Sequence, residues 1–384
     1  MIALLERQPP KPVAAMSLTQ LAAKLLANRG EATGTALARE LTQRYRKASS
    51  EDRLRFFSYL HDDLGVSHEK VRSAAQAYLA EESQPNVLPL SDAVEAPRLA
   101  LFRSLNLATD GIATLVAIRE HLGRDFPDVE HDLHHLLHSW FNRGFLTLQP
   151  IDWNSSAAVL EKIIQYESVH EITGWGDLRS RLLPDRRCFA FFHPAMDGDP
   201  IIFVEVALTK GLAHSIPHLI GEHRPEIPPS EADTATFYSI SNCHRGLRGI
   251  GFGNFLIKQV VTLLRNEFPQ LRTFATLSPI PGFRHWFEQH PTSEGEDSLE
   301  QACAQYLMHG TDPVARFHLG NGAELERINL NADPSERGIA QSYGLMVNYL
   351  YDPKHIEQNH EAFVSRGQII TSKSVRKLLR QRNP

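Results

Sequence analysis

The sequence has few cysteines and no long hydrophobic run. Only Cys188, Cys243 and Cys303 occur in 384 residues, a sparse and odd set that fits a reducing compartment better than a disulfide framework. No stretch approaches the roughly 18 uninterrupted apolar residues of a membrane-spanning helix. The opening MIALLERQPPKPVAAM breaks its short apolar run at Glu6 and Arg7, unlike a secretory signal peptide. We therefore expect a cytoplasmic protein that does not bind a membrane.

An excess of positive charge is also lacking. The formal net charge is -5 at pH 7, with 42% hydrophobic and 22% charged residues. This balance gives no bulk electrostatic reason to expect a nucleic-acid partner. The composition is that of a globular protein with a sizeable core, and the length suggests two domains.

The first part of the sequence has the pattern of amphipathic helices. Apolar residues recur at helical spacing in residues 17–82, beginning with Leu18, Leu21, Ala22, Leu25 and Leu26. A second helical group is expected at about residues 97–144. Between the two groups, the Pro-containing polar stretch SQPNVLPLSDAVEAPR is expected to form a separating connection.

After about residue 150 the pattern changes to short strands. We expect strands at 188–192, 201–208, 236–243 and 271–277, each bounded by turn residues. The turn DGDP predicts a hairpin between the first two, and an apolar-faced helix that ends near Pro269 separates the last two. The predicted fold class is therefore α+β, with an all-helical domain over residues 1–150 and a mixed α/β domain over residues 151–384.

A glycine-rich segment, RGLRGIGFGNFLIKQVV, follows the third predicted strand and opens the helix. Its Arg248, Gly251 and Gly253 resemble the Arg/Gln-x-x-Gly-x-Gly/Ala pyrophosphate loop of GNAT-type acetyltransferases. Glycines let backbone N–H groups approach phosphates, the helix N-terminus adds a positive end, and an arginine adds a charge-assisted hydrogen bond.

Other interpretations of this segment are open. A glycine-rich turn before a helix is often only a turn. The glycine spacing is wrong for a dinucleotide-binding fingerprint, and no Gly-Lys-Ser/Thr follows, as a Walker loop would require.

Several longer segments together resemble the malonyl-CoA decarboxylase family. They are FYSISNCHRGLRGIGFGNFLIKQVV, FPQLRTFATLSPIPGFRHW, DPVARFHLGNGAELERINLNAD and RGIAQSYGLMVNYLY, in that order. The resemblance covers nearly the whole chain and is weaker in the first hundred residues. It implies a GNAT-like catalytic domain, no cofactor and no metal, and a helical domain that forms a homo-oligomer (dimer or tetramer).

The resemblance also implies particular site residues. The catalytic serine and histidine fall on Ser278, within LSPIPGF, and on His318, within FHLGNGA, and a nearby tyrosine falls on Tyr351. The acyl-CoA contact segment falls on Arg248, Gly249, Ile250, Gly251, Phe252, Gly253 and Asn254. Animal members carry Glu at the Gly251 position, so the resemblance implies that another residue must orient the serine or histidine here if that carboxylate does so in them.

The chemistry of this family explains why such residues are needed. Loss of CO₂ from malonyl-CoA, which yields acetyl-CoA, leaves negative charge shared between C2 and the thioester oxygen. Catalysis needs a hydrogen-bond donor at that oxygen and an acid for C2. Ser278 can serve as the donor. His318, with an ordinary pKa near 6.5, can supply a proton, so a limb of kcat near or above pH 6.5 is expected.

Two rival functions remain. An acyl-CoA N-acyltransferase of the same fold would need an amine acceptor, whereas a non-catalytic acyl-CoA sensor would bind without turnover. The pair Ser278 and His318 argues against the sensor.

Three other groups invite weaker interpretations. One group is a set of four histidines at helical spacing, His131, His134, His135 and His138. Such a set could hold a metal ion, but histidines in such a helix are more often solvated. Cys243 and His244 are adjacent in a predicted strand and point to opposite faces, so Cys243 is expected to be a buried hydrophobe. The residues Tyr166, Glu167 and His170 lie on a plausible helix that either packs between domains or lines a ligand channel.

Overall fold

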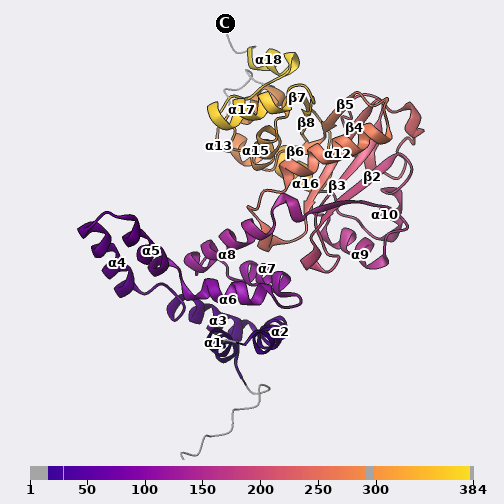
Figure 1. The fold of residues 1–384 in the computed structure, drawn as a ribbon. Helices are drawn as coiled ribbons and strands as arrows, with labels where there is room; N and C mark the ends of the chain where they lie inside the picture. The colour runs from indigo at the N-terminus through magenta and orange to yellow at the C-terminus, as the bar shows by residue number, and fades with distance from the viewer. Residues whose placement is uncertain (1–15, 29, 291–297, 381–384) are drawn as a thin grey trace, which may run out of the picture. The chain divides into compact units, whose positions relative to one another are not determined.

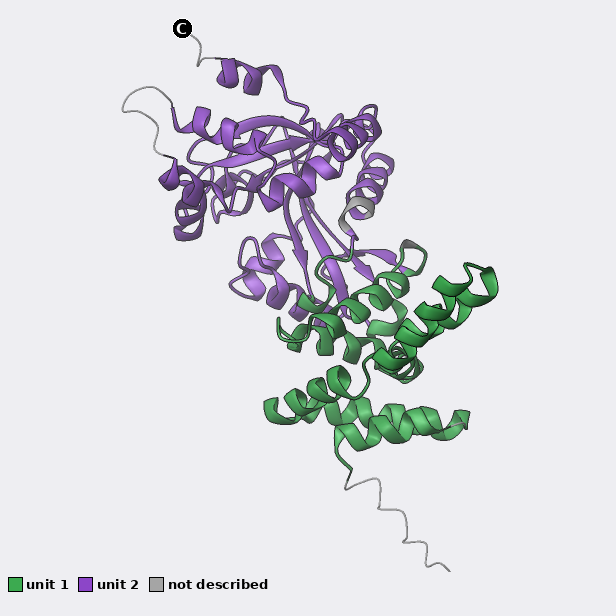
Figure 2. Cartoon of the chain, turned by 90° about the vertical axis from the view of Figure 1, so that its left-hand side faces the viewer, with its two compact units in different colours: residues 1–145, 193–197, 244–250 green, residues 146–192, 198–243, 251–384 purple. Residues whose placement is uncertain are grey.

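The computed structural model describes residues 16–28, 30–290 and 298–380, apart from the side chains of residues 143 and 253–255. The chain forms two compact units (Figure 2). The first, which we call the helical unit, contains residues 1–145, 193–197 and 244–250. The second, which we call the sheet unit, contains residues 146–192, 198–243 and 251–384.

The helical unit confirms the two predicted helical groups (Figure 1). Its helices are α1 (Leu18–Ala27), α2 (Glu31–Lys47), α3 (Ser50–Asp62), α4 (His68–Ala80), α5 (Gln84–Val94), α6 (Pro97–Asn106), α7 (Gly111–His121) and α8 (Pro127–Trp140). Ser17 caps α1 in a capping box with Gln20, which satisfies N–H groups that the first turn leaves unpaired. Leu21 and Leu25 of its apolar stripe are buried.

The polar stretch around residue 85 does not form the expected connection, because most of it is the helix α5. Pro85 lies in the first turn, where a missing N–H costs no intrahelical hydrogen bond. Pro89 lies inside the helix and removes one such bond. α5 packs against α4, so tertiary contact outweighs the low helix propensity of this sequence.

The sheet unit contains a mixed eight-stranded sheet in the order β1-β2-β3-β4-β5-β8-β6, with β7 also paired to β8. The strands are β1 (Thr147–Ile151), β2 (Arg186–Phe192), β3 (Pro200–Thr209), β4 (Thr234–Asn242), β5 (Thr273–Thr276), β6 (Ser278–Pro279), β7 (Glu324–Asn329) and β8 (Met346–Leu350). The α+β class and the four predicted strands are confirmed. The predicted hairpin is the antiparallel pair β2–β3. β1, β6, β7 and β8 were not predicted.

The sheet unit also contains ten α-helices among its described residues. They are α9 (Ala157–Tyr166), α10 (Trp175–Ser180), α11 (Ile216–Ile220), α12 (Gly253–Glu267), α13 (Phe283–Gln289), α14 (Leu299–Met308), α15 (Pro313–Gly320), α16 (Glu336–Ser342), α17 (Ile356–Arg366) and α18 (Lys373–Arg380). One apolar cluster joins α9 to β2 and β3 and includes Ile163, Ala190 and Phe203. Cys243 belongs to it, as expected of a buried hydrophobe. Among the described residues, no helix is long and apolar enough to cross a membrane.

The strands β4 and β5 are parallel neighbours that pair only over a short length. Thr234 to Phe237 lie opposite Thr273 to Thr276, and the Leu277 N–H still donates to the Phe237 carbonyl at 3.0 Å. β5 also pairs with β8 at Ala275, and beyond Leu277 the chain continues along β8 as β6. The carboxyl ends of β4 and β5 therefore separate at the residue before Ser278.

Candidate active site

Ser278 lies where the fifth strand leaves its parallel neighbour. It pairs with Val347 of β8, and its side chain is buried. Thr276, two residues earlier, lies on the same side of the strand, because strand residues alternate in direction. The Ser278 hydroxyl donates to Thr276 Oγ1 at 2.8 Å. Thr276 Oγ1 also accepts a hydrogen bond from the Tyr349 N–H at 3.1 Å. Two strands thus fix the position of the serine.

His318 lies in the last turn of α15. The helix begins after Asp312, whose side chain accepts the N–H groups of Val314 and Ala315 at 2.9 and 3.0 Å, as an N-cap carboxylate does. Pro313 occupies the first helical position, where its ring is tolerated. The sequence Asp-Pro therefore sets the start of α15, and its short length places the imidazole at its far end.

The structure brings Ser278, His318 and Tyr351 together, although they lie far apart in the sequence. Ser278 Oγ and His318 Nε2 are 3.0 Å apart, and His318 Nδ1 and the Tyr351 hydroxyl are 2.7 Å apart. All three side chains are buried. Tyr351 follows β8, where its N–H donates to the carbonyl of Phe274 in β5 at 2.8 Å. One continuous hydrogen-bonded chain thus links the three residues.

Among the described residues, no charged side chain contacts the imidazole of His318 to stabilise its protonated form. Its ring stacks on Tyr349, with centroids 4.7 Å apart, and lies edge-on to Phe317. Burial lowers the pKa of His318 from 6.5 to about 3, because desolvation penalises the imidazolium. A ring with this pKa is neutral at pH 7. It would therefore not produce the limb in kcat that the sequence predicts near or above pH 6.5.

The hydrogen bonds indicate which atoms carry the hydrogens in the buried series Ser278–His318–Tyr351. The single hydrogen of Ser278 points to Thr276, so the contact between Ser278 and His318 requires the hydrogen to be on Nε2. A neutral imidazole then has a bare Nδ1, which accepts from Tyr351. Burial raises the pKa of Tyr351 well above its ordinary value, so its hydroxyl keeps the hydrogen that it donates. His318 thus presents an N–H to the serine oxygen.

The predicted phosphate segment lies between β4 and α12. It contains the short helix η5 (Arg245–Leu247), a turn, and the start of α12 at Gly253. Gly249, not Gly251, has the left-handed backbone, with φ of 85°, which favours glycine. A Cβ at Gly251 would meet no atom within 4 Å, so the need for glycine there would come from a ligand. The side chains of residues 253 and 254 lie outside the described part.

The polar atoms of this segment are available to a ligand. Arg248 is exposed, and its guanidinium makes no hydrogen bond or ion pair with any described residue. The N–H groups of Gly249 and Gly251 likewise donate to no described atom. Because β4 and β5 are parallel neighbours, the start of α12 and Ser278 leave the sheet at the same edge.

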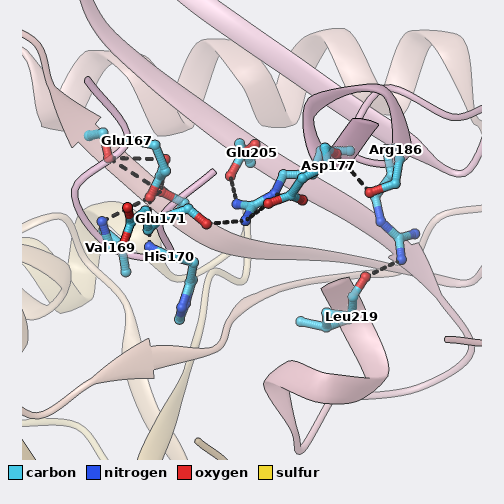
Figure 3. Close-up of polar contacts among 12 residues, drawn as sticks. Glu167, Val169, His170, Glu171, Asp177, Arg186, Glu205 and Leu219 are labelled. Atoms are coloured by element: carbon cyan, nitrogen blue, oxygen red, sulfur yellow. Dashed lines mark hydrogen bonds and ion pairs between the residues drawn. The ribbon is translucent and has the colours of Figure 1, made fainter. Parts of the chain in front are cut away.

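A second polar cluster includes side chains of β3 and β4, and Figure 3 shows several of its contacts. The predicted helix ends at Tyr166, and Glu167 instead accepts hydrogen bonds from Ser239 at 2.7 Å and from the backbone of His170 at 2.8 Å. Glu205 of β3 pairs with Arg181 at 3.1 Å. Burial raises the pKa of Glu205 to about 8, with Glu167 adding to the shift and Arg181 opposing it. This cluster anchors the chain after α9 to the sheet.

Two further arrangements bear on alternative sites. In the described part of the chain, no group of three or more histidine, cysteine or acidic side chains is placed to hold a metal ion. A groove of about 960 Å³ is lined by Thr234 and Thr273, at the amino ends of β4 and β5, and by residues 350–354. It therefore lies at the opposite end of these strands from Ser278.

Sequence reasoning missed two residues of the buried chain. Thr276 receives the serine hydrogen, and Tyr349 stacks on the imidazole. The spacing of Thr276 from Ser278, two residues along a strand, could have indicated a shared face. No local pattern pointed to Tyr349, because its strand β8 was not predicted.

Comparisons with known proteins cover both units. The sequence profile of the malonyl-CoA decarboxylase N-terminal domain matches residues 64–141, and that of the C-terminal domain matches residues 144–310 and 298–384. The mitochondrial malonyl-CoA decarboxylase of Anser anser anser is 34% identical in an alignment 388 positions long, and this alignment covers 82% of this chain and 77% of the relative. That of Rattus norvegicus is 32% identical in an alignment 413 positions long, which covers 87% of this chain and 83% of the relative.

Solved structures agree with the sequence relatives. A crystal structure of malonyl-CoA decarboxylase from Rhodopseudomonas palustris has a TM-score of 0.89 and 44% identity, covering 94% of this chain and 100% of that chain. One from Agrobacterium vitis has a TM-score of 0.86 and 45% identity, covering 94% and 99%. From the two domain profiles and the relatives above 30% identity, the chain belongs to the malonyl-CoA decarboxylase family.

Proposed function

We propose that this protein is a carboxy-lyase that converts malonyl-CoA to acetyl-CoA and CO₂. The observation that carries the proposal is the buried chain Ser278–His318–Tyr351, with contacts of 3.0 and 2.7 Å. It lies at the edge of the sheet where the predicted phosphate segment begins α12. Family membership supplies the substrate, and the buried chain supplies groups suited to its chemistry.

The proposed reaction breaks the bond between C2 and the malonyl carboxylate. The bonding electrons move onto the thioester as an enolate, CO₂ leaves, and C2 takes one proton, drawn in net terms from the solvent, to give acetyl-CoA. Ser278 turns its hydroxyl from Thr276 to the thioester oxygen and donates to the charge that develops there. A donor directed at such an oxygen acts mainly in the transition state.

In this proposal His318 and Tyr351 act on the serine. The Nε2 hydrogen of His318 binds the Ser278 oxygen, which makes the serine hydroxyl a stronger donor, since linked hydrogen bonds polarise one another. Tyr351 donates to Nδ1 and so keeps the hydrogen of the neutral ring on Nε2. The acidic partner expected from animal members at the Gly251 position is not needed for this arrangement.

The phosphates of the acyl-CoA are proposed to bind Arg248 to Asn254. The Arg248 guanidinium is exposed, and the N–H groups of Gly249 and Gly251 donate to no described atom. Both kinds of donor bind phosphate oxygens, which supports this placement. Gly253 and Asn254 begin a helix of 15 residues, whose positive end favours an anion.

The proposed reaction needs no metal or organic cofactor, because the substrate thioester already accepts the electrons. Exhaustive chelation followed by assay tests this point. Activity that is lost and then restored by one divalent ion would contradict it.

One assay tests the function against its rivals. The purified protein is given malonyl-CoA without any acceptor, and acetyl-CoA and CO₂ are measured. Equal amounts of both products support the decarboxylase. Turnover only after an amine is added would favour the N-acyltransferase, and binding without turnover would favour the sensor.

Self-association through the helical unit is part of the proposal. Neither α4 nor α5 contains a buried residue, and Leu79, Leu88 and Val94 are more than half exposed. Exposed leucines on neighbouring helices are typical of an interaction surface. A second copy of the chain, as a dimer or tetramer, is the proposed partner.

The cytoplasm remains the proposed compartment. The three cysteines are unpaired and buried, which suits a reducing environment. The goose and rat relatives are named as mitochondrial proteins. Fractionation of the source cells, followed by immunodetection, tests the location of this protein.

A further inference from the structure

The segment that precedes α12 is built into the helical unit. Residues 244–250 belong to the same compact unit as α7 and α8 (Figure 2). Arg119 of α7 donates from Nη1 to the carbonyl of Gly246 at 2.7 Å and to that of Arg248 at 2.9 Å. These contacts join residues separated by 127 and 129 positions in the sequence. The first half of the predicted phosphate segment is thus held by an N-terminal helix.

Arg119 is itself fixed in place. Its Nε and Nη2 donate to one carboxylate oxygen of Glu130 in α8 at 3.0 and 2.7 Å. The arginine side chain is only 9% exposed. A guanidinium anchored on one side keeps its remaining donors in a fixed direction, so the two carbonyls of the segment meet a rigid partner.

Close packing leaves the segment little freedom. A Cβ at Gly246 would lie 2.0 Å from the carbonyl oxygen of Val116 in α7, so only glycine fits there. The side chains of Leu247 and Ile250 are buried. The segment therefore rests directly on α7 at Gly246 and is tied to it again at Arg248.

The contact to Arg248 also orients the next donor. No cis peptide bond occurs in the described residues, and in a trans peptide the C=O and the following N–H point in opposite directions. Because the Arg248 carbonyl faces Arg119, the Gly249 N–H faces away from that guanidinium. This N–H is one of the two that donate to no described atom, and the left-handed φ of Gly249 maintains the turn.

We propose that Arg119 is a positioning residue for the acyl-CoA phosphates. This inference rests on the proposed function. Arg119 does not touch the substrate; it holds the carbonyls of Gly246 and Arg248 so that the Gly249 N–H and the Arg248 side chain are presented to the phosphates. Its loss should weaken binding of the nucleotide part of the substrate and leave the chemistry at Ser278 unchanged.

The test compares two substrates that differ in their phosphates. Malonyl-CoA carries them, and malonyl-N-acetylcysteamine has the same thioester without them. In Arg119→Gln, we expect kcat/KM for malonyl-CoA to fall about tenfold or more, mainly through KM, while the value for the truncated thioester changes by less than about twofold. Calorimetry should show weaker binding of CoA alone. Arg119→Lys, which keeps the charge and one donor, should lie between the two proteins.

A matched control is Arg98→Gln. Arg98 is another buried arginine of the helical unit, paired with Asp128 and Asp132 at 2.8 and 2.6 Å. Any loss of kcat/KM in Arg98→Gln should be the same for malonyl-CoA and for the truncated thioester. Equal losses on both substrates in both Arg119 variants, or no loss on malonyl-CoA, would overturn the inference. A wild-type protein that forms no acetyl-CoA would instead contradict the proposed function.

Discussion

At the scale of single residues, the candidate site is a set of neutral groups. Ser278, His318 and Tyr351 are all buried, and no carboxylate in the described part of the chain contacts the imidazole. This differs from a serine–histidine–aspartate triad, in which an acid stabilises the imidazolium. A neutral chain is suited to donating hydrogen bonds to an enolate oxygen, a task that needs no charged histidine.

The first prediction concerns the serine hydroxyl. Ser278→Ala should lower kcat by about 10²–10³-fold with little change in KM, because the hydroxyl acts on charge that develops during the reaction. Steady-state kinetics with malonyl-CoA measure both constants, and CoA binding by calorimetry checks that the variant is folded. A near-normal kcat would reduce Ser278 to a structural turn serine.

The second prediction concerns the histidine. His318→Asn should lower kcat by at most about 10²–10³-fold, the effect of losing the serine donor that the imidazole supports. Because burial lowers the pKa of His318 to about 3, the neutral form is already present throughout pH 5–8. The pH profile of kcat/KM should therefore contain no limb from His318 in this range, and the variant should show the same profile at a lower level. A limb near pH 6.5 that disappears in the variant would mean that the ring titrates as an ordinary histidine.

At the scale of elements, the segment between β4 and α12 combines two requirements for glycine. Gly249 needs it for its own backbone, with φ of 85°. Gly251 has an ordinary φ and no neighbour within 4 Å of a Cβ. Substitutions at these positions should therefore separate the shape of the segment from the space that the ligand needs.

The third prediction uses this pair. Gly251→Val should raise KM for malonyl-CoA and leave the melting temperature unchanged, because the added side chain meets only the ligand. Gly249→Ala should lower the free energy of unfolding by about 1 kcal/mol, the cost of a left-handed alanine. Thermal unfolding and kinetics of both variants check this. An unchanged KM in Gly251→Val would place the phosphates elsewhere.

At the scale of the whole molecule, the buried histidine links stability to pH. The folded pKa of His318 is about 3, whereas the unfolded chain titrates near its ordinary value of 6.5. As the pH falls below 6.5, protons bind the unfolded state first, so stability present at pH 7 is lost progressively towards pH 3.

The fourth prediction follows from this loss of stability at low pH. Between pH 6 and pH 4, the wild type should lose about 1.4 kcal/mol per pH unit more than His318→Asn, which has no group to titrate there. Urea unfolding at several pH values gives both curves, and their difference removes the contributions of other groups such as Glu205. Parallel curves would show that the imidazole can charge in the folded protein.

The fifth prediction concerns assembly. Replacing Leu79 and Leu88, which are 72% and 63% exposed, by glutamate should convert the proposed homo-oligomer to a smaller species, because charge in an apolar contact is costly. Light scattering after size-exclusion chromatography measures the mass. Decarboxylation should persist in the smaller species. A wild type that is monomeric at micromolar concentration would refute self-association through α4 and α5.

The sequence by itself determined the order of helical and mixed parts, because leucine spacing and strand alternation are local patterns. It also supplied the candidates Ser278 and His318, through the resemblance of LSPIPGF and FHLGNGA to segments of the malonyl-CoA decarboxylase family. It failed at α5, where contact with α4 stabilises a proline-containing helix, and at β7 and β8, which have weak local patterns.

Only the tertiary structure decided the state of the site residues. The 3.0 Å contact of Ser278 with His318 and the neutral imidazole depend on β5, β8 and α15 meeting in space. Burial that sets a pKa is a property of all surrounding atoms, so no motif contains it. The same holds for Arg119, whose contacts to Gly246 and Arg248 cross 127 and 129 residues of sequence. Such long-range contacts form only when the chain has folded.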